Sequence, residues 1–238
     1  PLRVLPPDQF DPTDFLPRID VETERVWDAF DDLRAKISSP TVKAAVDLFF
    51  ADDEFRVRFE RTPGAVNGHH SQLGGLHVFE VTKIAKTIAT TVRKANADLA
   101  VAGAMLHDIG KVEAYSTSPE GFAHTSTGML LGHVTLGALM FDRKLRDSGL
   151  TLAVAQRDEL LHFILSHHGA LEFGSPVQPM TVEAEIVHWA DEASAKATDM
   201  VDEMADPELF PPGSDIEVSA KRSWRLGRKL WRRPAPWD

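Results

Sequence analysis

Histidine and aspartate side chains recur in this chain where the surrounding pattern is apolar. The pair His107-Asp108 lies at the end of one apolar stretch, residues 99–109. Burying an imidazole beside a carboxylate is costly unless a partner satisfies both groups. A divalent metal ion does so, because it accepts nitrogen and oxygen ligands together. The pair is therefore a candidate metal site, although a lone His-Asp dipeptide also arises by chance or in structural roles.

Further imidazoles and one carboxylate lie on the apolar faces of other predicted helices. These residues are His77, His133, the pair His167-His168, and Asp191. A single such histidine is more often a hydrogen-bonded core residue than a metal ligand. Because buried polar groups need partners, the repeated pattern favours one shared explanation, a common metal centre.

Composition restricts the kind of metal site. The 238 residues include ten histidines and no cysteine, which excludes disulfides, thiol nucleophiles, iron–sulfur clusters and cysteine-ligated zinc. Imidazole and carboxylate groups must hold any metal. No apolar run approaches the ~18 residues of a membrane span, and the start lacks signal-peptide character, so we expect no membrane partner and a cytoplasmic protein. The chain begins at Pro1 rather than Met, which indicates part of a longer protein.

Helical periodicity dominates the chain and predicts an all-α fold class. A Pro-rich linker, or the remnant of an upstream domain, is expected over residues 1–20, and the helical domain over 21–210. Val26, Phe30 and Leu33 recur on one helix face. Further helices are expected over about 41–61, 76–95, 97–109, 128–147, 152–168 and 181–204, with a short hairpin over 115–122. Gly110 is expected to cap the helix that carries His107-Asp108, and Trp189 is expected in the core.

Residues 211–238 form a basic C-terminal tail. Seven of its residues between 221 and 233 are Lys or Arg and none is acidic; the rest of the chain keeps 19 basic and 36 acidic residues, a net charge of −17. Trp224, Leu226, Leu230 and Trp231 interleave with these charges, as in a cationic amphipathic helix. Such a helix suits either a nucleic-acid backbone with base stacking or packing of its Trp/Leu side on the acidic domain. Packing is the favoured interpretation.

The ordered polar positions resemble the signature of the HD-domain superfamily of metal-dependent phosphohydrolases. That signature, His, His-Asp, His, His-His and Asp, is matched by His77, His107-Asp108, His133, His167-His168 and Asp191, and residues 107–111 read HDIGK. The resemblance implies an HD-domain helical bundle with a dinuclear metal site in its core.

A closer resemblance is to the YhaM-type 3′→5′ exoribonuclease family. It rests on FFADDEFRVRF (49–59), His69-His70 before LGG (73–75), LLGHV (130–134), SHHGALEFGSPVQP (166–179) and EAEIVHWADEASAK (183–196). The family usually has an OB-fold before its HD domain; this chain lacks one, and residues 2–5 are expected to be its last remnant. The family's first ligand usually stands further past the Gly-Gly pair, where Phe79 lies, but the local register favours His77.

The resemblance implies two divalent metal ions, with Mn²⁺ expected and Fe²⁺, Zn²⁺ or Ni²⁺ as alternatives. One ion is expected to take His77, His107, Asp108 and Asp191, and the other Asp108, His133, His167 and, as a further candidate, His168. The catalytic candidates are Asp108, which would bridge the ions, and Lys111, which would hold a phosphate oxygen or else serve as an ordinary helix-dipole partner. His69, His70 and Lys111 are the candidate substrate-binding residues; for His69 and His70, solvent exposure is an equal alternative.

These features predict a phosphodiesterase in which a hydroxide activated by two metals attacks phosphorus. Its expected substrate is single-stranded RNA, degraded from the 3′ end, or short oligonucleotides. The acidic body argues against a long polyanion, so a nucleotide phosphohydrolase is the main alternative. A di-iron oxygenase and a non-catalytic metal-binding module are less favoured. The sequence leaves the metal identity, the choice between RNA and DNA, and the oligomeric state open.

Overall fold

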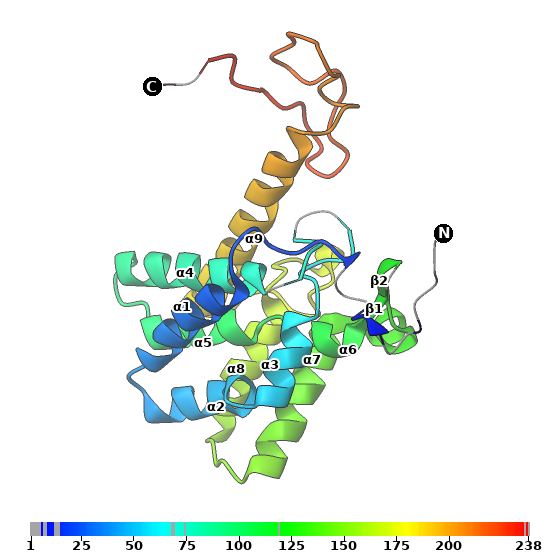
Figure 1. The fold of residues 1–238 in the computed structure, drawn as a ribbon. Coiled ribbons are helices and arrows are strands. Elements are labelled where there is room, and N and C mark those ends of the chain that lie inside the picture. The colour runs from blue at the N-terminus through cyan, green and yellow to red at the C-terminus, as the bar shows by residue number, and fades with distance from the viewer. Residues whose placement is uncertain are drawn as a thin grey trace.

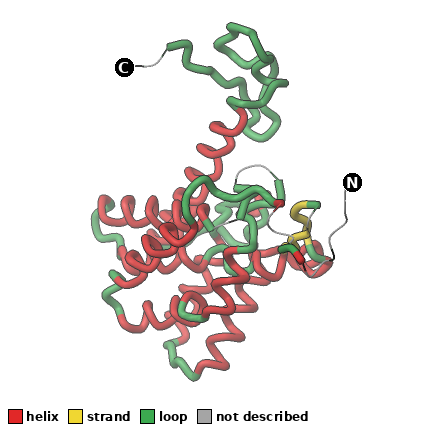
Figure 2. The backbone as a smooth tube through the Cα atoms, in the orientation of Figure 1, coloured by secondary structure: helices red, strands yellow, loops and turns green. Residues whose placement is uncertain are grey.

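The fold is helical, as the computed structural model shows for residues 6, 9–11, 15–67, 70–73, 75–118, 120–235 and 237 (Figures 1 and 2). The helices are α1 (Thr23–Ala35), α2 (Pro40–Phe50), α3 (Asp53–Glu60), α4 (Leu76–Thr91), α5 (Ala97–Leu106), α6 (Lys111–Ala114), α7 (Ser126–Ser148), α8 (Val154–Ser166), the 3₁₀ turn η3 (Leu171–Phe173) and α9 (Val182–Glu203). Strands β1 (Tyr115–Ser118) and β2 (Gly121–His124) pair antiparallel, with Tyr115 opposite His124. The all-α prediction is confirmed. None of the helices described here combines the length and apolar character needed to cross a membrane.

Helix α5 is the buried centre of the domain, packed against α4, α9, α2 and α8. Its small residues allow this close packing: a Cβ added at Gly103 would lie only 2.8 Å from the Phe163 ring of α8. An aromatic group that includes Phe49, Phe50 and Phe141 fills the space between α2, α3 and α7. Because α5 is enclosed, the residues at its carboxyl end, His107 and Asp108, are buried as well.

The helix predicted over residues 41–61 is two helices. It breaks after Phe50, where the Asp52 side chain accepts a hydrogen bond from the Phe55 backbone N–H and so caps α3. Asp52 also pairs with Lys144 of α7. The break turns α3 so that Phe49 and Phe55 meet edge to face, with ring centroids 5.1 Å apart. Aromatic packing therefore decides this boundary, which helical periodicity alone does not reveal.

The expectation that Gly110 caps α5 in a left-handed conformation is wrong, because its φ is −70°. Its role is close approach to α7, because an added Cβ would lie 2.0 Å from the His133 carbonyl oxygen and 2.3 Å from the Gly137 nitrogen. Helix α7 is itself interrupted at Gly132, where φ 72° and ψ 152° are accessible essentially to glycine alone. These two glycines bring His133 against the turn that carries Asp108.

The C-terminal tail is not the predicted amphipathic helix. Residues 221–233 form turns and loops at the far end of α9, which extends beyond the other helices (Figure 1). Leu230 is buried with Leu209 and Phe210, and Leu226 and the α9 residue Met200 pack against this cluster. The leucines therefore pack as expected, but Trp224 and Trp231 are exposed. Gly227, at φ 65°, is in a left-handed conformation that breaks helical continuity.

Trp189 is not a core residue. Its side chain is 56% exposed, and its indole Nε1 donates a hydrogen bond to Glu185 one turn earlier in α9. The residues expected as an OB-fold remnant, 2–5, lie outside the described residues.

Replacing Gly110 with Ala should destabilise the domain by at least about 3 kcal/mol, because the new methyl group overlaps α7 backbone atoms that cannot move independently. Urea unfolding followed by circular dichroism measures the change. Gly149→Ala is the matched control: it has a left-handed φ of 73° but open space around it, so strain alone should cost about 1 kcal/mol. Equal losses in the two variants would contradict the close-approach role.

Candidate metal centre

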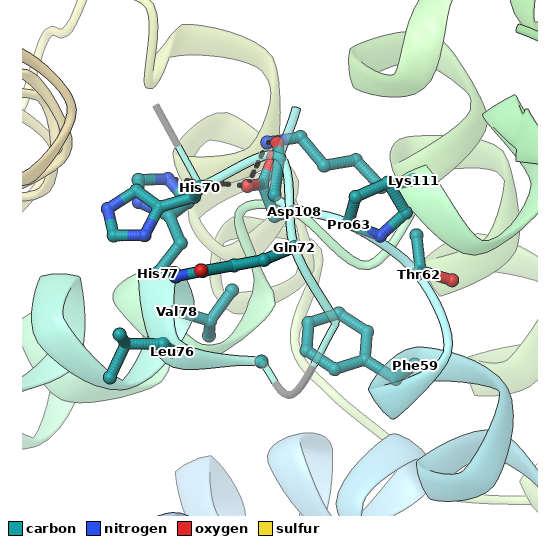
Figure 3. Close-up of a pocket in the computed structure, with 12 residues that line it drawn as sticks. Phe59, Thr62, Pro63, His70, Gln72, Leu76, His77, Val78, Asp108 and Lys111 are labelled. Atoms are coloured by element: carbon teal, nitrogen blue, oxygen red, sulfur yellow. Dashed lines mark hydrogen bonds and ion pairs between the residues drawn. The ribbon is translucent and has the colours of Figure 1, made fainter. Parts of the chain in front are cut away.

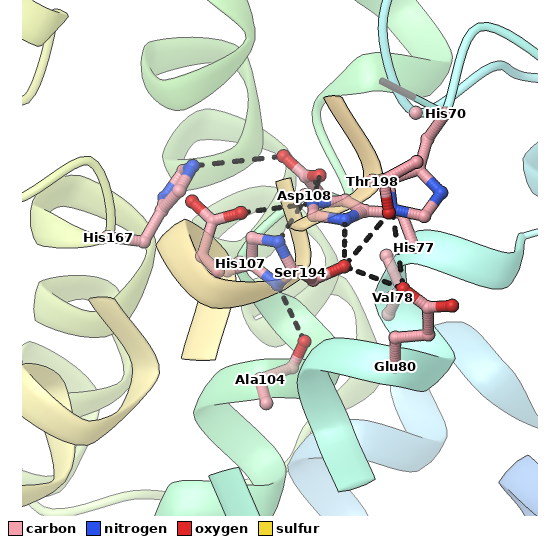
Figure 4. A network of polar contacts seen from close by, with 12 residues as sticks. His70, His77, Val78, Glu80, Ala104, His107, Asp108, His167, Ser194 and Thr198 are labelled. Atoms are coloured by element: carbon pink, nitrogen blue, oxygen red, sulfur yellow. Dashed lines mark hydrogen bonds and ion pairs between the residues drawn. The ribbon is translucent and has the colours of Figure 1, made fainter. Parts of the chain in front are cut away.

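Asp108 lies at the centre of the buried polar residues and is itself 1% exposed. Its Oδ2 atom lies 3.2 Å from His107 Nε2 and 3.6 Å from His77 Nε2. Its Oδ1 atom lies 3.5 Å from His133 Nε2 and 3.7 Å from His167 Nε2. The two oxygens of one carboxylate therefore face two different pairs of imidazoles (Figure 4 shows the His77, His107 and His167 rings around it).

Two groups of potential metal ligands flank this carboxylate. Within each group the donor atoms lie within 4.8 Å of one another; one group is His77, His107 and Asp191, and the other is His133, His167 and His168. In the first group, His77 Nε2 lies 3.0 Å from Asp191 Oδ1. Every residue predicted as a metal ligand is thus brought to one place, and the assignment of these residues as ligands stays a prediction.

Several of these side chains lie at the start or the end of a helix. His77 lies in the first turn of α4, which begins after Gly75 (φ 68°). His107 and His167 are the C-cap residues of α5 and α8. Phe79, the alternative to His77, packs against the hydrophobic core instead, with the Lys83 ammonium 5.1 Å from its ring centroid. His77 rather than Phe79 therefore faces the centre.

Backbone carbonyls hold three of the imidazoles in one tautomer. The Nδ1 atom lies 2.6 Å from the Ala104 oxygen in His107, 2.8 Å from the Ile164 oxygen in His167, and 2.7 Å from the Phe173 oxygen in His168. A carbonyl can only accept, so Nδ1 carries the proton and donates. In the neutral ring Nε2 then presents its lone pair, which is the form that binds a metal.

The residues fit a pair of divalent metal ions. His107 Nε2, His133 Nε2, His167 Nε2 and Asp108 Oδ1 are all buried and have no hydrogen-bond partner among the described residues. Buried polar atoms without partners are rare and costly, and these atoms converge on Asp108. Metal ions on either side of the carboxylate would satisfy them. A nitrogen-and-oxygen ligand set suits manganese, iron or zinc rather than a soft, thiolate-preferring ion.

Burial and neighbouring charges set the ionisation of the centre. Burial lowers the pKa of His77 to about 4 and that of His133 to about 3, and it holds the pKa of His167 well below its usual value. These rings are therefore neutral at pH 7. Burial alone would raise the pKa of Asp108, but Lys111 and His107 outweigh it and hold that pKa well below its usual range. The carboxylate is ionised, as a bridging ligand requires.

Lys111 neutralises part of this charge. It is buried at the start of α6, and its Nζ donates to Asp108 Oδ2 and to the Gly64 carbonyl oxygen, each at 2.5 Å. Among the described residues its ammonium has no hydrogen bond to a terminal carbonyl of the preceding helix, and the choice between a substrate role and a helix-dipole role stays a prediction. Lys111 and Asp108 line a pocket with His70, His77 and the loop that begins at Thr62 (Figure 3).

His70 is buried, so the alternative of a solvent-exposed loop residue is wrong for it. Its Nε2 lies 3.1 Å from Ser194 Oγ, 3.2 Å from Thr198 Oγ1 and 3.4 Å from Glu80 Oε2. It lines the same pocket as His77, and its role in substrate binding stays a prediction. His69 lies outside the described residues.

Ser194 and Glu80 orient His77, and neither was expected from the sequence. The Ser194 hydroxyl donates to Glu80 Oε2 over 2.8 Å, and His77 Nδ1 lies 3.2 Å from the same hydroxyl oxygen. Since the single hydroxyl proton goes to the carboxylate, the oxygen accepts from Nδ1–H, which leaves the His77 Nε2 lone pair facing Asp191. The available signal was spacing: each follows a predicted ligand by three residues, one helical turn.

His188 contacts the opposite side of the centre. Its Nδ1 lies 2.8 Å from the His167 carbonyl oxygen, to which it donates. Its ring also lies against Gly169, where an added Cβ would lie 2.2 Å from the ring. His188 therefore supports the backbone of the His167-His168 pair.

Comparison with known proteins gives one family and a set of relatives. Residues 75–196, just over half of the chain, match the family described as HD domain. The 3′-5′ exoribonuclease YhaM of Bacillus subtilis is 32% identical over 187 residues, 77% of this chain and 57% of that protein. The protein of the same name from Geobacillus sp. is 31% identical over 210 residues, 86% of this chain and 61% of the relative.

The YhaM protein of Bacillus velezensis is 37% identical over 145 residues, 60% of this chain and 45% of that protein. The chain thus spans between about half and three-fifths of the length of these curated relatives. No solved structure matches the chain.

Replacing Ser194 with Ala should weaken binding of one of the two metal ions by about 10- to 100-fold, because His77 loses the contact that orients its ring. Calorimetric titration with Mn²⁺ measures both affinities, and the second ion should bind as in the parent protein. Thr82→Val is the matched control, since Thr82 is a buried α4 hydroxyl whose one hydrogen bond among the described residues goes to the Val78 carbonyl of its own helix. Unchanged affinities in Ser194→Ala would contradict the orienting role.

Proposed function

Because the chain belongs to the HD domain family, we propose that it is a metal-dependent phosphohydrolase that shortens single-stranded RNA from its 3′ end. The observation that carries the proposal is the placement of Asp108, whose two oxygens face separate pairs of imidazoles. One carboxylate shared between two metal ions is the arrangement of phosphodiester-cleaving two-metal sites.

The ligand assignment follows the two groups around Asp108. His77, His107 and Asp191 would hold one ion, His133, His167 and His168 the other, and Asp108 would contact both. When bound, the ions would supply an activated water molecule and neutralise charge on the phosphodiester. Mn²⁺ is the expected metal, with Fe²⁺, Zn²⁺ or Ni²⁺ as alternatives that this donor set also accepts.

Two side chains that line the pocket, Lys111 and His70, have proposed roles toward the substrate. The Lys111 ammonium lies at the pocket wall beside Asp108 and donates to a phosphate oxygen of the substrate, which stabilises the negative charge that develops during attack on phosphorus. Burial disfavours its charge, but Asp108 outweighs this and raises its pKa, so the ammonium stays protonated. His70 lines the same pocket next to His77 and would contact the substrate there.

The RNA substrate and the 3′ polarity come from the relatives' names and belong to the proposal. The chain covers only part of those relatives' lengths. Nucleotide hydrolysis is the second candidate, because outside residues 221–233 the chain keeps a net charge of −17, which disfavours a long polyanion. The cytoplasmic location expected from the sequence stays a prediction.

A single assay series tests the proposed function. The full chain with Mn²⁺ is offered a 5′-labelled 12-nucleotide RNA, bis(p-nitrophenyl) phosphate and nucleoside triphosphates. We expect stepwise shortening of the RNA from its 3′ end and hydrolysis of the model diester. Asp108→Ala, which removes the shared carboxylate, should abolish both reactions and the binding of both metals. Turnover of nucleotides alone would support the second candidate, and full metal loading without any turnover would support a non-catalytic module.

Replacing Lys111 with Ala should lower kcat/KM for the RNA and for the model diester by about 100- to 1000-fold, as loss of a charge-stabilising donor does. Lys111→Arg should retain more activity. Lys144→Ala is a close control, because Lys144 also contacts one carboxylate, Asp52, and one backbone carbonyl, Leu48, but lies outside the metal centre. An equal effect of the two alanine variants on kcat/KM would contradict a role for Lys111 in the reaction.

A further inference from the structure

We propose that the C-terminal loops, residues 219–235, are a docking surface for single-stranded RNA whose 3′ end lies in the metal centre. The surface consists of the exposed residues Trp224, Trp231, Arg222, Arg228 and Arg233, and we call it the tail surface. The proposal rests on the proposed function for its choice of RNA, and it adds a binding site at a distance from the reacting bond.

The tail tryptophans are held out to solvent by the residues between them. Leu226 and Leu230 pack against the end of α9, whereas Trp224 is 85% and Trp231 53% exposed. The Arg225 guanidinium lies 5.8 Å from the Trp224 ring centroid, and Trp231 Nε1 donates to Glu217. Both indoles nevertheless keep more than half of their surface exposed, so they are suited to stacking with nucleobases. One such stack changes the affinity for a single strand by roughly 5- to 150-fold and is tolerant of sequence, because every base has a π-face.

The positive charge of the tail surface is partly free of internal pairing. Lys221 pairs with Glu208, and Arg225 lies 3.3 Å from Asp199. Within the part of the chain that the structure describes, Arg222, Arg228 and Arg233 have no acidic partner, and all three are exposed. These arginines alternate with the tryptophans along the chain. A backbone of phosphates with unstacked bases matches that alternation, because phosphate and base repeat together along a strand.

The tail surface is rigidly connected to the metal centre. Helix α9 carries Asp191 and runs on to Glu203, an axial distance of ~18 Å for twelve residues. The tail packs on Met200 and Met204 at that end of the helix. Helix α9 therefore links the tail surface to the proposed metal centre.

A cavity lies between the tail and the loop before α4. Trp224 and Arg225 line it from the tail, and Ser71 lines it from the loop before α4. The adjacent residue His70 lines the pocket beside Asp108. The acidic residues of this cavity, Asp202, Glu203 and Asp206, belong to the end of α9 and the turn after it, so they repel phosphates there and favour a strand that runs along the arginines.

A membrane surface fits the tail less well than RNA does. A chain segment that lies in a lipid interface needs a continuous apolar face along an amphipathic helix. In the described structure, residues 221–233 form turns and loops, with Leu230 buried and Leu226 half-buried in the cluster at the end of α9. What remains exposed is separate indole rings and guanidinium groups, which is the composition of single-strand binding surfaces.

Fluorescence anisotropy tests the tail surface with the full chain. A 5′-fluorescein-labelled 12-nucleotide oligo(A) RNA is titrated in EDTA, so that no cleavage occurs. The double variant Trp224→Ala/Trp231→Ala should bind at least about tenfold more weakly than the parent. Trp189→Ala, which removes a comparably exposed tryptophan from α9 outside the tail, should bind as the parent does. An abasic 12-mer should bind the parent and the double variant equally, because it has no bases to stack.

Three outcomes would overturn the proposal. The first is unchanged RNA affinity in the double variant, and the second is an equal loss of RNA affinity in Trp189→Ala. The third comes from a parallel titration with vesicles of phosphatidylserine and phosphatidylcholine: the double variant loses affinity for the vesicles but not for RNA. Circular dichroism confirms that the variants fold, and hydrolysis of bis(p-nitrophenyl) phosphate should be the same in parent and double variant. If the parent binds RNA through the tail tryptophans but hydrolyses no substrate, the tail surface stands and the proposed function fails. If the parent shortens RNA and the double variant does so with the same KM, the proposed function stands and the tail surface fails.

Discussion

A buried, ionised carboxylate is the constraint on which the rest of the structure depends. Asp108 is almost fully removed from solvent, yet Lys111 and His107 keep its pKa well below the usual range. Burying an uncompensated charge costs several kcal/mol, so the surrounding fold must supply partners on every side. Lys111 and the imidazoles of α4, α5, α7 and α8 do so, and the unpartnered atoms among them are those that metal ions would bind. The fold thus gathers these side chains around Asp108.

Close packing of the helix backbones makes this arrangement possible. The small residues of α5 and the contact of Gly110 with α7 bring helix ends together at distances that larger side chains would prevent. Carbonyl oxygens at the ends of α5 and α8 then fix the imidazole tautomers without further side chains. His77 is instead oriented by a side chain, Ser194, which ties α4 to α9. The same α9 carries the tail, so one helix joins the metal centre to the surface that we propose for RNA.

Much of the fold and nearly all of the centre could be predicted from sequence, because buried polar residues on apolar helical faces are conspicuous. His77, His107, Asp108, His133, His167, His168 and Asp191 all lie where the pattern indicates, although their binding of metals awaits measurement. The break before Asp52 and the interruption at Gly132 could not be predicted, since aromatic packing and close helix contacts decide them. The periodicity of the tail predicts a helix, whereas Gly227 and the docking of Leu226 and Leu230 determine its actual path. Ser194 and Glu80 were missed because a serine and a glutamate on a helix are ordinary surface residues until their partners are known.

The central claim is that one carboxylate, Asp108, joins two metal ions in this centre. Electron paramagnetic resonance of the full chain titrated with Mn²⁺ tests it directly, because ions ~3.5–4 Å apart across a shared ligand are magnetically coupled. The account predicts that the second equivalent of Mn²⁺ converts the spectrum to that of an exchange-coupled pair. A spectrum that stays a simple six-line signal at two bound equivalents, or a protein that binds only one ion, would contradict it.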